Sequence, residues 1–291
     1  MEPSEARTAL DLVVRREGFL VGGAVGAALV AVPAVAAGLP PQLGGRRRAA
    51  TALADELLIE LTSGGVDLRR LAGRWIDWQR VDGLDADPLL VLALDHLRDF
   101  DAPVAVLPSG SVAAIAAVLP AALASASPRA MIAGSFHVAR MLDPREATAL
   151  AAMATVLAAA AFLEGRRDFV PDVVAALRAN DATIELLDAI RTIPRDPGAA
   201  PSVPVGINPD PVAVVTWVLW QAYHRPRGDD VMHEFAVASD VPPTVGAIVG
   251  ALFGARDGIE SWPAAWMERG GEEVTRRRAL ARRLGGIAVR G

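Results

Sequence analysis

Apolar residues recur along most of the chain at the spacing of three and four residues that one face of an α-helix requires, and Gly and Pro separate the runs. After Arg46-Arg47-Arg48, for example, Leu53, Leu57 and Leu61 share one face. Runs of β-branched residues are short. The pattern predicts an all-α fold with helices over residues 4–17, 17–39, 46–61, 68–80, 88–97, 112–123, from 128 onward, 143–165, 169–179, 182–192, 211–223, 229–238 and 244–255, then a Trp-containing segment at 261–267 and a charged C-terminal helix.

The most apolar stretch runs from Glu17 to Leu39, has no charge beyond its first residue, and is rich in Gly, Ala and Val. Because small side chains let another backbone approach closely, we interpret it as the central buried helix of a large helical domain. A membrane span is one alternative, since about 20 apolar residues suffice, but Pro33 and the low Leu content argue against it. An export signal cleaved after Ala34-Val35-Ala36 is another, but the amphipathic pattern of residues 1–14 argues against it.

Composition narrows the classes of function. No interior segment resembles a linker and no repeat has a fixed period, so we expect a single domain over residues 1–291. Of the 291 residues, 52% are hydrophobic, which is enough for a large core. A net charge of −5 gives no reason to expect nucleic-acid binding. The absence of cysteine excludes disulfides, thiolate metal sites and a Cys nucleophile, and suits a cytoplasmic protein.

Five strings occur in a fixed order over nearly the whole chain. They are Gly18, Gly22, Ala24 and Gly26; Thr51 ahead of LADELLIEL and then Trp75 and Trp78; Ser109-Gly110-Ser111 ahead of an apolar helix; Ser135 and His137 ahead of Pro144; and Thr244, VGAIVGALFGA and Trp262-Pro263-Ala264-Ala265-Trp266. Together they resemble the ADP-ribosylglycohydrolase family, which includes the dinitrogenase-reductase-activating glycohydrolases. The stretch from Thr244 to Trp266 is the most specific. The resemblance implies a large, orthogonally packed, all-α domain.

The resemblance also implies a binuclear metal centre, because enzymes of that family hold two divalent cations, usually Mg or Mn, between these helix starts. Here the family's Thr-Asp-Asp becomes Arg48-Ala49-Ala50, the Asp of its first motif is Ala27, and its Glu falls near Ala34. Its final Asp-x-Asp-Thr keeps Thr244 and at most Asp240. Two hard cations need several carboxylates. We therefore predict no metal site, no cofactor and no metal-dependent hydrolysis of ADP-ribosyl groups.

A few polar residues at these helix starts are candidates for ligand binding. The Arg48 guanidinium could hold a phosphate or carboxylate, or it belongs to a solvated basic run. The turn Ser109, Gly110, Ser111 could present N–H groups to an anion, or it caps the next helix. Asp240 is a candidate general acid or base, or a helix cap. Thr51 and Thr244 are further candidates for ligand binding.

Other conspicuous residues have structural interpretations. We expect His137 to be a structural histidine, and Trp217 and Trp220 to belong to the core. The C-terminal arginines are expected to form a solvated helix face, balanced by neighbouring acidic residues: Arg276, Arg277, Arg278, Arg282 and Arg283 with Glu268, Glu272 and Glu273.

The apolar frame of the family persists where its chemical residues are missing. We therefore expect a pseudoenzyme that acts as a ligand-binding or protein-interaction module. Its ligand would be nucleotide-like, anionic or small and apolar, its partner a protein, and neither nucleic acid nor a membrane is expected. The alternative is an enzyme with a repurposed, metal-independent pocket in the same cleft, with Asp240 and Arg48 as its polar groups.

Overall fold

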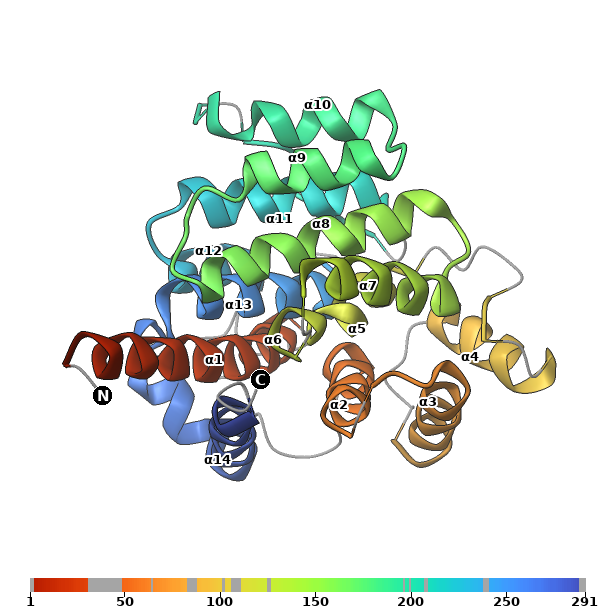
Figure 1. The fold of residues 1–291 in the computed structure, drawn as a ribbon, viewed down its shortest axis with the longest axis horizontal. Helices are drawn as coiled ribbons and strands as arrows, with labels where there is room; N and C mark the ends of the chain where they lie inside the picture. The colour runs from red at the N-terminus through yellow and green to blue at the C-terminus, as the bar shows by residue number, and fades with distance from the viewer. Residues whose placement is uncertain are drawn as a thin grey trace.

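The computed structural model describes residues 3–30, 49–63, 65–82, 88–100, 103–105, 111–124, 127–195, 197–198, 200–206, 209–237 and 241–287. Within these residues every regular element is a helix, with fourteen α-helices, two 3₁₀ turns and no strand (Figure 1). The all-α fold that the hydrophobic spacing predicts is therefore confirmed.

The α-helices are α1 (Pro3–Val30), α2 (Ala49–Thr62), α3 (Leu68–Asp82), α4 (Pro88–Phe100), α5 (Ala113–Val118), α6 (Ala121–Ala124), α7 (Pro128–Leu142), α8 (Glu146–Leu163), α9 (Val170–Ala179), α10 (Ile184–Thr192), α11 (Pro211–His224), α12 (Gly228–Val237), α13 (Pro243–Asp257) and α14 (Ala264–Ile287). The 3₁₀ turns are η3 (Ile193–Arg195) and η4 (Ile259–Ser261).

Two predicted helix boundaries are wrong. Residues 4–17 do not form a separate helix, because no proline or pair of glycines stops the chain there, and α1 continues to Val30. The predicted helix over 112–123 is instead α5 and α6, because Pro120 has no amide N–H to continue the hydrogen-bond ladder. Residues 31–39 of the predicted central helix lie outside the described residues.

At the centre of the molecule α1 and α13 run antiparallel in direct backbone contact. Three glycines of α1 face three of α13: Gly18 opposite Gly254, Gly22 opposite Gly250, and Gly26 opposite Gly246. A Cβ atom added at Gly22 would lie 2.1 Å from the Gly250 carbonyl oxygen, and one at Gly26 would lie 1.9 Å from that of Gly246. Only glycine permits this approach. The prediction of a central buried helix is confirmed for residues 17–27, which are all buried.

The alanine-rich helix α8 forms the middle of the core, in contact with α5, α7, α11 and α13. Among the described helices it alone is long and apolar enough to cross a membrane, and 78% of that window is buried inside the protein. In Figure 1, α9 and α10 stack beyond α8 and α11, while α3 and α4 lie at the opposite edge beyond α2. The burial of α8 is that of a core helix.

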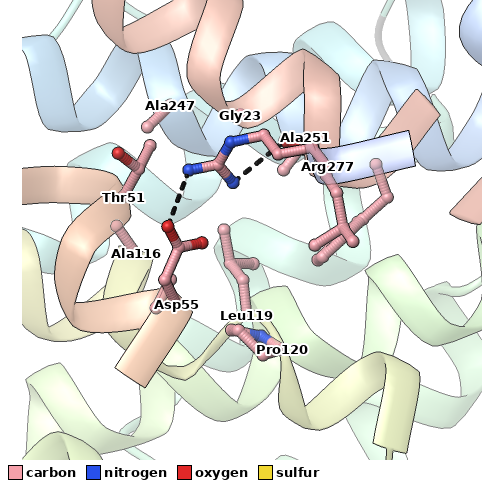
Figure 2. Close-up of a pocket in the computed structure, with 12 residues that line it drawn as sticks. Gly23, Thr51, Asp55, Ala116, Leu119, Pro120, Ala247, Ala251 and Arg277 are labelled. Carbon is pink, nitrogen blue, oxygen red and sulfur yellow. Dashed lines mark hydrogen bonds and ion pairs between the residues drawn. The ribbon is translucent and has the colours of Figure 1, made fainter. Parts of the chain in front are cut away.

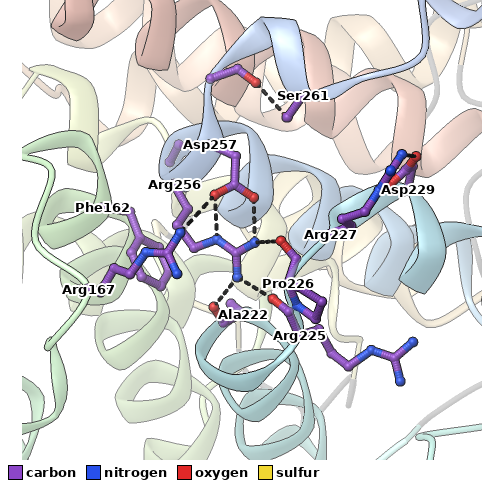
Figure 3. Close-up of polar contacts among 12 residues, drawn as sticks. Phe162, Arg167, Ala222, Arg225, Pro226, Arg227, Asp229, Arg256, Asp257 and Ser261 are labelled. Carbon is purple, nitrogen blue, oxygen red and sulfur yellow. Dashed lines mark hydrogen bonds and ion pairs between the residues drawn. The ribbon is translucent and has the colours of Figure 1, made fainter.

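A buried arginine, Arg256, ties the end of α13 to the connection between α11 and α12 (Figure 3). Its Nη1 donates to the carbonyl oxygens of Ala222 and Arg225, each at 2.7 Å, and its Nη2 donates to that of Pro226 at 3.0 Å. Its Nε donates to Asp257 Oδ1 at 2.7 Å. One side chain therefore satisfies several carbonyls that the end of α11 leaves without helical partners.

Candidate functional site

A small cavity lies where α1, α2, α5, α13 and α14 meet (Figure 2). Its volume is about 30 Å³, which leaves room for about two water molecules. Most of its walls are apolar, and its polar groups come from Thr51 and Asp55 on α2 and from Arg277 on α14. The cavity lies about one turn below the starts of α2 and α13, where the family resemblance places ligand motifs. This is the cleft of the fold, and it is almost filled.

The side chain that fills the cleft is Arg277. Its Nη2 lies 3.0 Å from Asp55 Oδ2, its Nη1 donates to the Leu20 carbonyl oxygen at 3.3 Å, and both charged side chains are only 4% exposed. Arg276 donates to the same Asp55 oxygen, also at 3.0 Å. Figure 2 shows the guanidinium reaching across from α14 to meet Asp55. An ion pair therefore occupies the place where a ligand would enter.

A second buried carboxylate extends this contact along α14. Glu17 of α1 is 4% exposed and accepts hydrogen bonds from Arg278 and Arg282, each at 2.7 Å. The expectation that the C-terminal arginines form a solvated face is therefore wrong for these residues. The acidic residues that balance them lie on α1 and α2, more than 200 positions away in sequence. Only the outer part of the cluster, including Arg283, is exposed.

Three of the predicted site residues lie among the described residues. Thr51 is 7% exposed and lines the cavity. Thr244 is buried in the first turn of α13 and is not among the lining residues. Ser111 is 2% exposed, and its Oγ accepts from the amide of Ala113 at 3.2 Å, as a helix cap does. Arg48, Ser109, Gly110 and Asp240 lie outside the described residues, so their predicted roles stay predictions.

The side chains present do not fit a pair of divalent cations. Ala27 and Ala49, at positions where the family has aspartates, are buried, and Ala27 packs against Ala247. Asp55 is the carboxylate that lines the cavity, and two arginines already bind it. Within the described residues no group of three or more His, Asp or Glu side chains could hold a metal ion. Since hard cations need several oxygen ligands, this cleft lacks the donors.

The residues that sequence reasoning missed are Asp55, Arg277 and Glu17. Arg277 carries a detectable signal, because it falls on the buried stripe of α14 with Val274, Ala281 and Leu284, three and four positions apart. An arginine inside an apolar stripe needs a buried acidic partner. The identity of that partner has no local signal.

A larger hollow of about 250 Å³ lies between α3 and α4, away from the family motifs. Arg69, Arg80 and Arg98 line it together with Ile76 and other residues. Arg98 already pairs with Asp95 at 2.9 Å and with Asp99 at 2.8 Å. This hollow therefore offers no assembled anion site.

The remaining expectations for individual residues agree with the structure. Trp217 and Trp220 are 2% and 7% exposed, as core residues should be. His137 lies beside the ring of Phe136 on α7 and is not among the residues that line the cavity.

Comparison with known proteins identifies the fold and the family. No curated protein sequence matches the chain. A solved structure described as an ADP-ribosylglycohydrolase-related protein complex superposes with a TM-score of 0.72 at 22% sequence identity, over 94% of this chain and 97% of that one. The family model for ADP-ribosylglycohydrolase matches residues 10–290. The chain therefore belongs to the ADP-ribosylglycohydrolase family.

Proposed function

We propose that this protein is a non-hydrolytic member of its family, which binds no metal in its cleft and acts as a ligand-binding or protein-interaction module. The observation that carries the proposal is the Arg277 guanidinium, which occupies the cleft and pairs with Asp55. A fixed positive charge in this cleft repels a second cation, and the repulsion is strongest where water is excluded. Alanines replace the carboxylates that would offset it.

The interaction role has separate support. The solved relative is described as part of a protein complex. In this chain Val81 of α3 and Phe100 of α4 are 74% and 62% exposed, at the edge of the molecule farthest from α9 and α10. Large exposed apolar side chains that lie on neighbouring elements are typical of surfaces that contact other proteins. A closed cleft with such an edge fits a protein that works by contact better than one that works by turnover.

Metal-independent catalysis in the same cleft is the alternative. Asp240 and Arg48 would be its polar groups, and the walls formed by Leu20, Leu119 and Ala251 would suit a small apolar substrate. The cleft would then have to open, because about 30 Å³ admits no substrate. Turnover by protein that has been dialysed against a chelator would favour this alternative.

Calorimetric titration with Mg²⁺ and Mn²⁺, with and without ADP-ribose, tests the proposal. We expect no metal binding by the wild type or by Arg277→Met, because neither has the carboxylates. Stoichiometric binding of two ions by the wild type would overturn the proposal. Binding by Arg277→Met alone would show that the guanidinium, rather than the missing carboxylates, keeps metal out.

A further inference from the structure

The last helix is held over the cleft by charges more than by apolar contact. Among the described side chains of α14, the inward stripe consists of Val274, Arg277, Ala281 and Leu284. The position directly over the cleft carries a guanidinium, and Ala281 has little apolar area to bury. The apolar seam of α14 is therefore small for a helix of 24 residues.

Its charged contacts are numerous and specific. Glu17 and Asp55, both 4% exposed, each accept hydrogen bonds from two arginines of α14. The cost of removing such ions from water largely offsets their attraction, so buried pairs fix a geometry more than they stabilise it. The closed position of α14 is thus well defined but held with little surplus free energy.

We propose that α14 is a latch on the cleft. In the closed state Arg277 fills the cleft, and in the open state the guanidinium leaves and the Asp55 carboxylate faces solvent between the apolar walls of Phe19 and Leu119. Helices with few buried apolar side chains open at a free energy below that of global unfolding. Gly258, at φ +80°, and Pro263 lie in the short connection between α13 and α14, where the chain can turn.

This inference rests on the proposed function, in which the cleft carries no metal and is open to control by the protein's own helix. It adds that access to the cleft is set by the Arg277–Asp55 pair. A ligand that binds only the open state would shift the equilibrium by its preference for that state.

Hydrogen exchange followed by mass spectrometry on the full chain tests the latch. In Arg277→Met the Asp55 carboxylate keeps only Arg276 as a donor, so we expect residues 274–284 to exchange at least tenfold faster than in the wild type. Residues in α8 should exchange at the wild-type rate. Arg283→Met is the matched control, because it makes the same change on the exposed face of the same helix. It should leave exchange unchanged.

The double variant Asp55→Asn/Arg277→Met tests whether the two residues act as a pair. Removing both charges leaves no buried carboxylate behind, so we expect slower exchange in residues 274–284 than in Arg277→Met. Unchanged exchange in Arg277→Met, acceleration that extends equally to α8, or no recovery in the double variant would each overturn the latch. The metal titration is independent of these outcomes, so failure of the latch and failure of the proposed function can be told apart.

Discussion

Glu60 shows how a single residue couples the stability of this protein to pH. Its side chain on α2 is fully buried and accepts hydrogen bonds from Arg70 at 2.7 Å and from Arg74 at 2.8 Å. The hydrogen bond from Arg70, aided by Arg74 and opposed by burial, lowers the pKa of Glu60 below its usual range. The folded state therefore gains stability from this group above the unfolded pKa of about 4.3, and loses it as the pH falls through the lower folded pKa.

We predict that Glu60→Gln lowers the free energy of unfolding by about 1–3 kcal/mol at pH 7, because two charged hydrogen bonds are lost. The difference from the wild type should shrink as the pH falls below about 4. Urea unfolding across this pH range measures it. Glu164→Gln is the control, since Glu164 is 61% exposed beside Arg166 and its pair should contribute less than about 1 kcal/mol. A difference for Glu60→Gln that persists into acid would contradict the prediction.

At the scale of elements, the contact between α1 and α13 depends on glycine for space rather than for backbone freedom. At Gly22 an added methyl group would meet the backbone of α13, which cannot move aside as a side chain can. Gly73, on the exposed face of α3, has no atom within 4 Å of the same added group. The same substitution should therefore have opposite effects at the two sites.

We predict that Gly22→Ala destabilises the fold by at least about 1–3 kcal/mol through overpacking. Gly73→Ala should stabilise it by about 0.5–1 kcal/mol, because alanine loses less conformational entropy in a helix. Thermal unfolding of the two variants beside the wild type checks both signs. A neutral Gly22→Ala would mean that α1 and α13 are not in backbone contact.

The helices are predictable from sequence where their signals are local. Asp67 accepts from the amides of Arg69 and Arg70 at 2.9 and 3.1 Å, as expected of the cap that starts α3. Pro88 and Pro128 likewise open α4 and α7. The glycine spacing of α1 indicates close packing but not its partner, because the matching glycines of α13 lie more than 200 residues away.

At the scale of the whole molecule, the first helix is enclosed by the last two, and this closure determines the cleft. α1 contacts α13 through glycines and α14 through Glu17, whose partner Arg278 is 261 positions away. No periodicity connects residues at such separations. The family resemblance could therefore indicate which carboxylates were missing, but not that an arginine from α14 occupies the cleft.

Arg256 holds the same assembly together from the other end of α1. Its own carbonyl oxygen accepts from Arg15 of α1, which also donates to the Phe162 carbonyl of α8 at 3.4 Å. With its contacts to Ala222 and Pro226, it links α1, α8 and α13 to the turn after α11. Because these contacts are shared among four elements, their loss should affect the whole fold rather than one helix.

We predict that Arg256→Met lowers the free energy of unfolding by about 3–5 kcal/mol, since several buried carbonyls lose their donor. Arg256→Lys should recover only part, because an ammonium cannot reproduce the planar fork of donors. Urea unfolding should show one transition at lower denaturant with an unchanged slope, as expected if the fold still unfolds as a unit. Arg166→Met, which removes a half-exposed guanidinium from exposed partners, should change the midpoint little. Separate transitions for α13 and for the remainder would show that Arg256 serves its own helix alone.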